Sequence, residues 1–143
     1  MDEIKIKELN SLDEMLLAYP IISQRYQEMN LENYKKQISE MIEMNDFKMI
    51  GAFSGDEILG VAGYWVLRML YCGRYIQVSS FIVDGEKRGG GIGKKILAEI
   101  DKIGKKLNCE KVVLDSFTEN KKSHPLYYRE GFYIRGFHFM KDL

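Results

Sequence analysis

The segment Arg88-Gly-Gly-Gly-Ile-Gly93 decides the organisation of this chain, because it joins two predicted elements of different kinds. Before it, residues 75–83 are rich in β-branched and aromatic side chains, which favour a strand. After it, apolar residues recur at helical spacing along one face, from Ile92 to Leu107. A glycine-rich connection from a strand to an amphipathic helix predicts an α/β fold with a mixed sheet.

The glycines of this segment are suited to hold a phosphate group. Glycine adopts positive φ without a steric penalty, and it lets the backbone approach a ligand closely. The first N–H groups of a helix have no partner in the helix and carry partial positive charge. A phosphate or pyrophosphate is therefore predicted to bind the backbone of residues 89–94, with added charge from basic side chains. The predicted phosphate contacts are Arg88, Gly89, Gly90, Gly91, Ile92, Gly93 and Lys94.

Two common phosphate loops do not match this segment. A Walker A loop needs a glycine where Arg88 stands and a serine or threonine where Lys95 stands. A Rossmann GxGxxG loop needs a glycine at Lys94 or at Ile96, depending on where it starts. The pattern that fits is Arg-x-x-Gly-x-Gly, which begins at Arg88.

Strands and helices are predicted on both sides of the glycines. The predicted order is β-α-α-β-β-β-α-β-α-β, in which three consecutive strands with short turns form an antiparallel meander. Ser11 is predicted to cap the first helix and Pro20 to end or kink it, while Gly131 is predicted to cap the last helix. The predicted strands begin at Ile4 and cover 47–53, 58–70, 75–83, 111–114 and 132–140, and helices cover 31–44 and 125–130.

Length and composition describe one globular domain. The chain has 143 residues, of which 45% are hydrophobic and 29% charged, and its net charge is zero. One domain over residues 1–143 is therefore expected, and a nucleic-acid partner is not, because no strongly basic patch occurs. Cys72, Cys109, His124 and His138 make a poor zinc set, so no metal is predicted.

The sequence predicts a cytoplasmic location. The N-terminus has no apolar signal-peptide core. No run approaches the roughly 18 apolar residues of a membrane span, so no membrane partner is expected. The two cysteines lie far apart and require no disulfide, which fits a reducing compartment.

The chain resembles the GNAT superfamily of acyl-CoA-dependent N-acetyltransferases in two motifs that have the right order and separation. The first is the Arg-x-x-Gly-x-Gly loop, with Val83 as the hydrophobic residue five positions before Arg88. The second is Asn120, followed seven positions later by Tyr-Tyr-Arg-Glu-Gly-Phe over residues 127–132. The resemblance covers essentially the whole chain. It implies a GNAT-like fold whose largely antiparallel sheet is splayed between the fourth and fifth strands.

The resemblance implies transfer of an acetyl group from acetyl-CoA to a primary amine, by direct attack of the amine in a ternary complex. The diphosphate of acetyl-CoA would lie on the glycine loop. Backbone groups of Phe81, Ile82 and Val83 would bind its pantetheine arm. A backbone N–H of the same strand would polarise the thioester carbonyl.

Proton transfer in this reaction needs an acid and a base. By resemblance, Tyr127 is the predicted acid for the departing thiolate, with Tyr128 as the alternative, and Asn120 joins Tyr127 as an acetyl-CoA contact. Many family members carry a glutamate on the fourth strand where this chain has Gln77, which cannot act as a base. Water relayed by Gln77 or the nearby serines, or the carboxylate of Asp115, is therefore predicted to take the amine proton.

The acceptor is predicted to be a cationic small molecule or a protein amine. Residues 1–60 carry 6 Lys/Arg against 12 Asp/Glu, and in the resembling family the first helices cover the acceptor side. Tyr26, Glu28 and Tyr34 are the predicted acceptor contacts. The missing strand glutamate leaves a second interpretation open, a non-catalytic acyl-CoA-binding sensor or interaction module. A homodimer through terminal strands is the assembly that the resemblance suggests.

Overall fold

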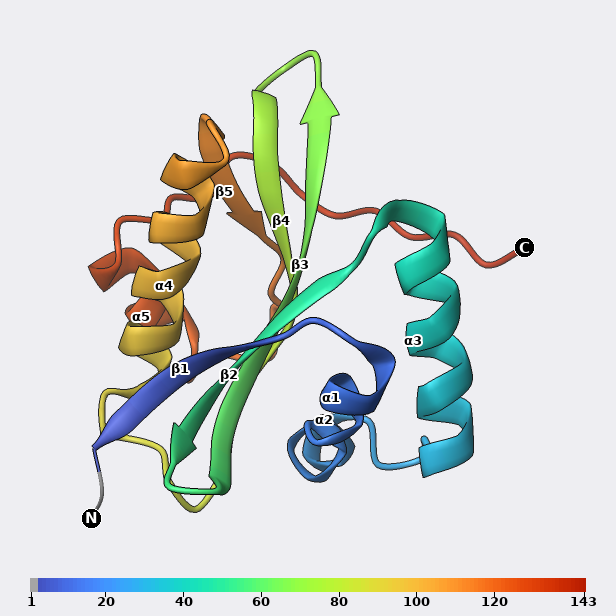
Figure 1. The fold of residues 1–143 in the computed structure, drawn as a ribbon. Coiled ribbons are helices and arrows are strands. Elements are labelled where there is room, and N and C mark those ends of the chain that lie inside the picture. Colours follow the sequence, from blue (N-terminus) through green and yellow to red (C-terminus); the bar gives the residue numbers. More distant parts are fainter. Residues whose placement is uncertain (1–2) are drawn as a thin grey trace.

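The computed structural model describes residues 3–143, which form a five-stranded sheet with helices on both faces (Figure 1). The strands lie in sequence order across the sheet, and each neighbouring pair is antiparallel except β4 and β5. The mixed sheet and the α/β class predicted from the sequence are confirmed. The strands are β1 (Ile4–Leu9), β2 (Lys48–Ser54), β3 (Glu57–Met69), β4 (Gly73–Val83) and β5 (Lys111–Leu114). The helices are α1 (Leu12–Leu16), α2 (Tyr19–Arg25), α3 (Leu31–Asn45), α4 (Ile92–Lys106) and α5 (His124–Arg129).

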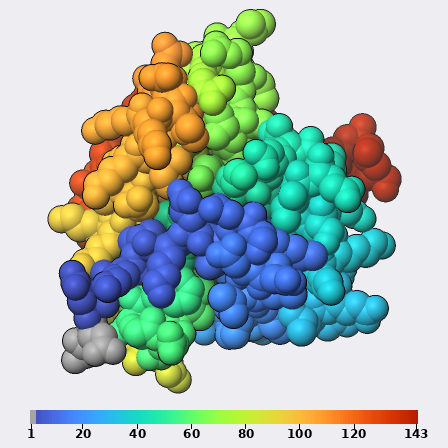
Figure 2. All heavy atoms as spheres, viewed as in Figure 1, coloured from blue at the N-terminus to red at the C-terminus, as the bar shows by residue number. Residues whose placement is uncertain are grey.

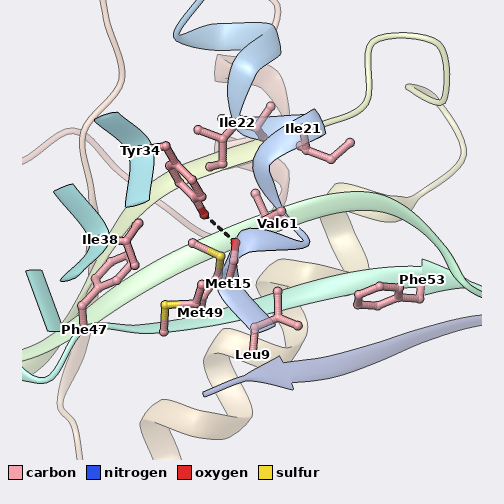
Figure 3. Packing of buried hydrophobic residues seen from close by; sticks show 12 residues of the cluster. Leu9, Met15, Ile21, Ile22, Tyr34, Ile38, Phe47, Met49, Phe53 and Val61 are labelled. Carbon is pink, nitrogen blue, oxygen red and sulfur yellow. Dashed lines mark hydrogen bonds between the residues drawn. The ribbon is translucent and has the colours of Figure 1, made fainter. Parts of the chain in front are cut away.

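Two apolar cores, one on each face of the sheet, hold these elements together. α1, α2 and α3 pack on one face, where strand residues such as Met49 and Val61 meet their side chains (Figure 3). α4 packs on the other face and buries Ile96 and Ile100 completely. Full burial of one such side chain contributes about 1.5–3 kcal/mol. The apolar stripe of α4 therefore fixes the start of this helix, and with it the glycine loop, against the sheet.

β4 and β5 diverge halfway along β4. Their parallel pairing ends at Val78↔Leu114. From Ser79 to Val83, β4 pairs with β3 alone among the described strands. We call Ser79–Val83 the open edge of β4, because its backbone faces the gap that β5 leaves. This divergence confirms the predicted splay between the fourth and fifth strands.

A β-bulge at Ser80 changes the direction of the open edge. The register between β3 and β4 shifts there, because Gly63 pairs with Ser79 whereas Val61 pairs with Ile82. Ser80 has a φ of 56°, in the left-handed region that residues other than glycine rarely adopt. Bulges and strained residues of this kind gather near functional sites, where they redirect backbone and side-chain groups. The bulge was not predicted from the sequence.

The N-terminal helices differ from the prediction at Pro20. Ser11 caps α1 as predicted, and its hydroxyl oxygen accepts a hydrogen bond from Glu14 N at 3.1 Å. Pro20, however, lies in the first turn of a separate helix, α2, and neither ends nor kinks the first helix. Proline suits a first turn because its missing N–H needs no partner there and its φ is already helical. Residues 10–47 therefore contain three helices instead of the predicted two.

The strands predicted over residues 132–140 do not form, and this prediction is wrong. Residues 132–143, here called the C-terminal tail, follow α5 without pairing to any described strand. The end of the tail stands out from the body of the molecule near α3 (Figure 1, Figure 2). Its apolar side chains beyond Phe132 are largely exposed, with 67% at Tyr133 and 92% at Phe139. Alternating apolar residues favour a strand only where a neighbouring strand supplies backbone partners, and the tail has none.

Candidate active site

The glycine loop presents backbone N–H groups at the N-terminus of α4. Gly91 caps this helix with a φ of 80° and no side-chain hydrogen bond, and Gly89 has a φ of 88°. The helical ladder begins with Lys95 N, which donates to the Gly91 carbonyl oxygen at 3.1 Å, so earlier amides have no helical partner. A Cβ atom added at Gly89 or Gly91 would meet no atom within 4 Å. Arg88 and Lys94 are exposed beside this open space, which fits a phosphate group.

The start of the loop is fixed to the rest of the fold. Asp84 N donates to the Leu59 carbonyl oxygen at 2.8 Å, and Asp84 Oδ1 accepts the N–H of Glu86 at 3.0 Å. Gly85 N donates to the side-chain oxygen of Gln24 on α2 at 3.0 Å. The loop therefore leaves β4 from a fixed point, and the end of α2 is held beside it.

Gly93 allows α4 to approach β4 and α5 closely. A Cβ atom at this position would lie 3.1 Å from Leu126 Cδ2 and 3.2 Å from Phe81 Cζ. These distances are shorter than ordinary van der Waals contacts. The last glycine of the Arg-x-x-Gly-x-Gly pattern is therefore explained by packing, whereas the preceding glycine is explained by its backbone conformation.

The Tyr-x-x-x-Gly-Phe motif forms a Schellman turn at the end of α5. Phe132 N donates to the Tyr127 carbonyl oxygen at 2.9 Å, and Gly131 N donates to the Tyr128 carbonyl oxygen at 3.1 Å. Gly131 adopts the left-handed conformation that this turn requires, with a φ of 91°, which confirms the predicted cap. The rings of Tyr127 and Phe132 meet edge to face, with centroids 6.0 Å apart. The motif therefore holds the Tyr127 ring in one place.

The surroundings of Tyr127 keep its hydroxyl protonated. Its ring centroid lies 6.2 Å from that of Phe81 on the open edge of β4. Burial raises the pKa of Tyr127 above its ordinary value, and the charge of Arg25 and a hydrogen bond with Ser123 offset this only in part. Tyr128, the predicted alternative, is 57% exposed and has no such contacts with the open edge. Of the two tyrosines, Tyr127 is therefore the one whose ring contacts the open edge of β4.

Asn120 is held in the turn that leads into α5. Its side-chain oxygen accepts a hydrogen bond from Ser123 Oγ at 3.3 Å, and its carbonyl oxygen accepts Ser123 N at 3.2 Å. Tyr127 N in turn donates to the Ser123 carbonyl oxygen at 3.3 Å. Asn120 is thus connected to Tyr127 through Ser123, which explains in structural terms why the two residues belong to one motif.

Gln77 and Asp115, which the sequence suggested separately, lie in contact. Gln77 Nε2 donates to Asp115 Oδ2 at 3.2 Å. Asp115 follows β5 directly, at the point where β4 and β5 part. The other carboxylate oxygen, Oδ1, lies 3.5 Å from Nδ1 of His138 on the C-terminal tail. Sequence analysis missed His138 as a site residue, because no local pattern connects it with Asp115.

The predicted acceptor contacts separate in the structure. The Tyr26 hydroxyl lies 3.4 Å from Ser80 Oγ, so the end of α2 borders the bulge of β4. Glu28 is exposed in the connection between α2 and α3. Tyr34 is only 2% exposed, and its hydroxyl donates to the Met15 carbonyl oxygen at 2.7 Å inside the core (Figure 3). Tyr34 therefore packs the core and is removed from the candidate acceptor site, because its hydroxyl cannot reach a ligand.

Comparison with known proteins shows which family the chain belongs to. The family model described as acetyltransferase (GNAT) family matches residues 11–132. The chain is 23% identical over 141 residues to YhdJ, an uncharacterised N-acetyltransferase of Bacillus subtilis (strain 168), covering 98% of this chain and 99% of that protein. It is 36% identical over 55 residues to a glucosamine 6-phosphate N-acetyltransferase of Trypanosoma brucei brucei, covering 38% of this chain and 35% of that protein. An aminoglycoside N-acetyltransferase, AAC(6')-Iy, solved in complex with CoA, shares the fold with a TM-score of 0.82 at 16% identity, over 100% of this chain and 97% of that one.

The glycine loop, the open edge of β4 and the half-buried Tyr127 all lie within the residues that the family model matches. The match over residues 11–132 shows that the chain belongs to the acetyltransferase (GNAT) family. It is an acetyl-CoA-dependent acyltransferase, and acetyl-CoA is its cosubstrate. In the described part of the chain, no helix is long and apolar enough to cross a membrane. Residues 3–143 also contain no group of three or more His, Cys, Asp or Glu that could hold a metal ion.

Proposed function

We propose that this protein transfers the acetyl group of acetyl-CoA to a primary amine, by direct attack of the amine in a ternary complex. The observation that carries this proposal is the open edge of β4, which leads into the glycine loop at one end and contacts Tyr127 through Phe81. One strand thus connects the phosphate-binding end, the backbone groups for the acyl arm and the proton donor.

Acetyl-CoA would bind along the open edge of β4. Its diphosphate would lie on the N–H groups of residues 89–94, with charge from the side chains of Arg88 and Lys94. Its pantetheine arm carries amide groups, which would pair with the backbone of residues 81–83 as one strand pairs with another. Asn120 would approach the cosubstrate from the turn before α5, beside Tyr127.

The proposed reaction moves two protons together with the acetyl group. The ammonium first loses one proton to a base, because only the neutral amine has an electron pair for attack. The nitrogen then attacks the thioester carbon, so that the N–C bond forms and the C–S bond breaks with its electron pair on sulfur. Tyr127 gives its proton to that sulfur, and the second proton of the nitrogen returns to Tyr127 through solvent. The raised pKa of Tyr127 supports this role, since the phenol stays protonated at neutral pH.

The contact between Gln77 and Asp115 supports a proton path on the amine side. Gln77 would orient a water molecule and the carboxylate of Asp115, which it holds at 3.2 Å. Both side chains lie where β4 and β5 part, next to the backbone that would bind the acyl group.

We propose a cationic small molecule or a protein amine as the acceptor. Tyr26 borders the bulge of β4, Glu28 is exposed nearby in the chain, and residues 1–60 carry an excess of acids. The names of two similar proteins point to aminoglycosides and to glucosamine 6-phosphate, which share a primary amine. An acidic surface favours an acceptor with several positive charges among such amines.

We also propose that residues 1–143 act as one cytoplasmic domain that forms a homodimer. The exposed apolar side chains of the C-terminal tail support a dimer, because burying them requires a partner surface. Among the described strands β5 pairs with β4 alone, so its outer edge is also available. The free thiols of Cys72 and Cys109 support a cytoplasmic location, where thiols stay reduced.

Release of the CoA thiol tests the proposed function. The purified chain is incubated with acetyl-CoA and a polyamine, an aminoglycoside or a lysine peptide, and with neutral amines and the anionic amine glucosamine 6-phosphate as comparison. We expect amine-dependent thiol release with at least one cationic acceptor. Binding of acetyl-CoA without release by any amine would favour the sensor interpretation. Release with neutral or anionic amines alone would contradict the cationic acceptor.

A further inference from the structure

We propose that His138 of the C-terminal tail is the base that takes the first proton of the amine, and that Asp115 and Gln77 hold its ring in place. This inference rests on the amine transfer proposed above. His138 Nδ1 lies 3.5 Å from Asp115 Oδ1, while Asp115 Oδ2 accepts a hydrogen bond from Gln77 Nε2 at 3.2 Å. These contacts bring together β4, the end of β5 and the tail. We call the three residues the His138 cluster.

The His138 cluster lies on the face of the sheet that α1, α2 and α3 share. Gln77 stands opposite Trp65 in the β3–β4 ladder, and Trp65 packs against the core beneath these helices. Leu114 packs against the other core, beneath α4, so the next residue, Asp115, points to the face of Gln77. The cluster is therefore on the same side of the sheet as α2 and the acidic N-terminal part of the chain.

The His138 cluster also borders the open edge of β4. The last pair between β4 and β5 is Val78↔Leu114, so Gln77 and Asp115 flank the point where the strands part. Under the proposed function, the thioester lies beside the β4 backbone just beyond this point. An amine that approaches from the face of α1–α3 would meet the cluster as it reaches the open edge.

An imidazole is better suited to accept this proton than the side chains that hold it. A carboxylate ordinarily protonates near pH ~4 and an amide accepts no proton, whereas imidazole changes charge near neutral pH. When Nδ1–H donates to Asp115, the neutral ring leaves the lone pair of Nε2 free. The ammonium proton moves to Nε2, the ring becomes charged beside the Asp115 carboxylate, and the proton then passes to water. The His138 side chain is 57% exposed, so water can reach it.

The charges around the His138 cluster come from three parts of the chain. Asp115 is the acid that faces the ring, and Arg135 is a base of the same tail. Tyr71 and Cys72 of the β3–β4 turn and Tyr75 of β4 interact electrostatically with Asp115 or its neighbours, and Tyr71 also with Arg135. Tyrosine and cysteine are uncharged at neutral pH. Asp115 is therefore the charged group that contacts the ring.

The tautomer of His138 tests this geometry without any substrate. The chain has 2 histidines, so the ¹⁵N NMR signals of the His138 ring are assigned by comparison with His138→Gln. The reference is His124, whose Nε2 lies 3.1 Å from both Ser116 Oγ and the Phe117 carbonyl oxygen. With the rings neutral, we expect the Nδ1–H form of His138 in the wild type and a shift towards Nε2–H in Asp115→Ala. An Nε2–H ring in the wild type, or a ring that ignores Asp115→Ala, overturns the proposal.

The pH dependence of kcat tests the proton transfer itself. With a reactive amine, His138→Gln is expected to lower kcat about 100-fold, the range of lost general-base catalysis, and to abolish the fall in rate at acid pH. The thermal shift caused by acetyl-CoA should stay unchanged. Lys141→Gln, which removes another exposed tail charge, should match the wild type. A His138→Gln enzyme with wild-type kcat and pH profile overturns the proposal. A wild type that binds acetyl-CoA but acetylates no amine overturns the proposed function instead. In that case the tautomer of His138 still tests whether Asp115 holds the ring.

Discussion

Two glycines with left-handed backbones flank the candidate site. The N–H groups beside one of them have no partner in the helix, whereas those beside the other are hydrogen-bonded. Gly91 starts α4 with a φ of 80°, and the amides that follow it have no partner in the helix. Gly131 ends α5 with a φ of 91°, and its turn is closed by bonds back to Tyr127 and Tyr128. A helix start has spare donors, which a ligand can take, whereas a helix end has spare acceptors, which the chain itself satisfies. One glycine leaves a binding site open, and the other fixes a side chain.

The largest effect is expected at Tyr127, whose ring is held by the turn at Gly131. Tyr127→Phe removes the hydroxyl but keeps the ring between Phe81 and Phe132. We expect kcat for thiol release to fall about 100-fold, as on loss of a general acid, with an unchanged thermal shift by acetyl-CoA. Tyr128→Phe at the exposed neighbouring residue is the matched control and should behave as the wild type. Equal losses of kcat in both variants would show that the turn does not select Tyr127.

The dependence of kcat on pH in the alkaline range further tests the assignment of Tyr127 as the acid. Burial raises the pKa of Tyr127 above the ordinary tyrosine pKa of about 10. A raised pKa keeps the acid form present to higher pH, so kcat should decline only above pH ~10. The decline should be missing from the residual activity of Tyr127→Phe. A decline that begins well below this pH and persists in the variant would assign it to another group.

Reversing the charge of Arg88 in the glycine loop is expected to remove acetyl-CoA binding. Acetyl-CoA at ~100 times its dissociation constant should stabilise the wild type by about 2.7 kcal/mol, measured as a rise in the midpoint of thermal unfolding. Arg88→Glu places a negative charge beside the phosphate site and should abolish this rise. Lys102→Glu makes the same charge change at a side chain that is 78% exposed, further along α4, and should keep the rise. Equal rises in Arg88→Glu and the wild type would remove Arg88 from the site.

Paired alanine substitutions at the two glycines test the comparison directly. Each alanine must adopt a left-handed backbone, which costs about 1–2 kcal/mol of folding stability. Gly91→Ala should in addition lose the acetyl-CoA thermal shift, whereas Gly131→Ala should keep that shift and lose kcat. Gly136→Ala in the tail, where an added Cβ meets no atom within 4 Å, is the control for an unstrained change. The comparison fails if the two variants lose the same property.

The smallest effect is expected at Gly93. An added Cβ would make contacts of 3.1 Å and 3.2 Å with Leu126 and Phe81, which is unfavourable. Alanine also favours a helix over glycine by about 1 kcal/mol, which opposes that cost. Chemical denaturation of Gly93→Ala should therefore show a change in unfolding free energy within about 1 kcal/mol. A loss of several kcal/mol would mean that α4, β4 and α5 cannot adjust around one methyl group.

Local patterns of sequence predicted the elements that depend on neighbours along the chain. The β5 strand was predicted over residues 111–114 and forms there, and Ser11 and Gly131 cap the predicted helices. Pro20 was misread because proline both stops one helix and starts another, and sequence alone does not choose. These features need only the intrinsic preferences of a few adjacent residues.

Features that depend on partners distant in sequence escaped prediction. The bulge at Ser80 exists only relative to the register with β3. Tyr34 sits on a helix with charged neighbours, and its burial is decided by the core it meets. The tail alternates apolar residues but finds no strand to pair with, and the contact between Asp115 and His138 depends on where the tail passes. Each of these outcomes is set by tertiary contacts.

The open edge of β4 also bears on how the protein avoids aggregation. An unpaired edge at the rim of a sheet is a template for uncontrolled joining of chains. This edge is recessed, because β5 pairs with β4 up to Val78 and diverges only beyond it. A strand of another chain would have to insert between two strands of one sheet, whereas the narrow pantetheine arm can enter at the end where β4 and β5 are furthest apart. The open edge of β4 thus keeps unpaired backbone groups for binding a ligand at a place where strands of other chains can hardly pair with them.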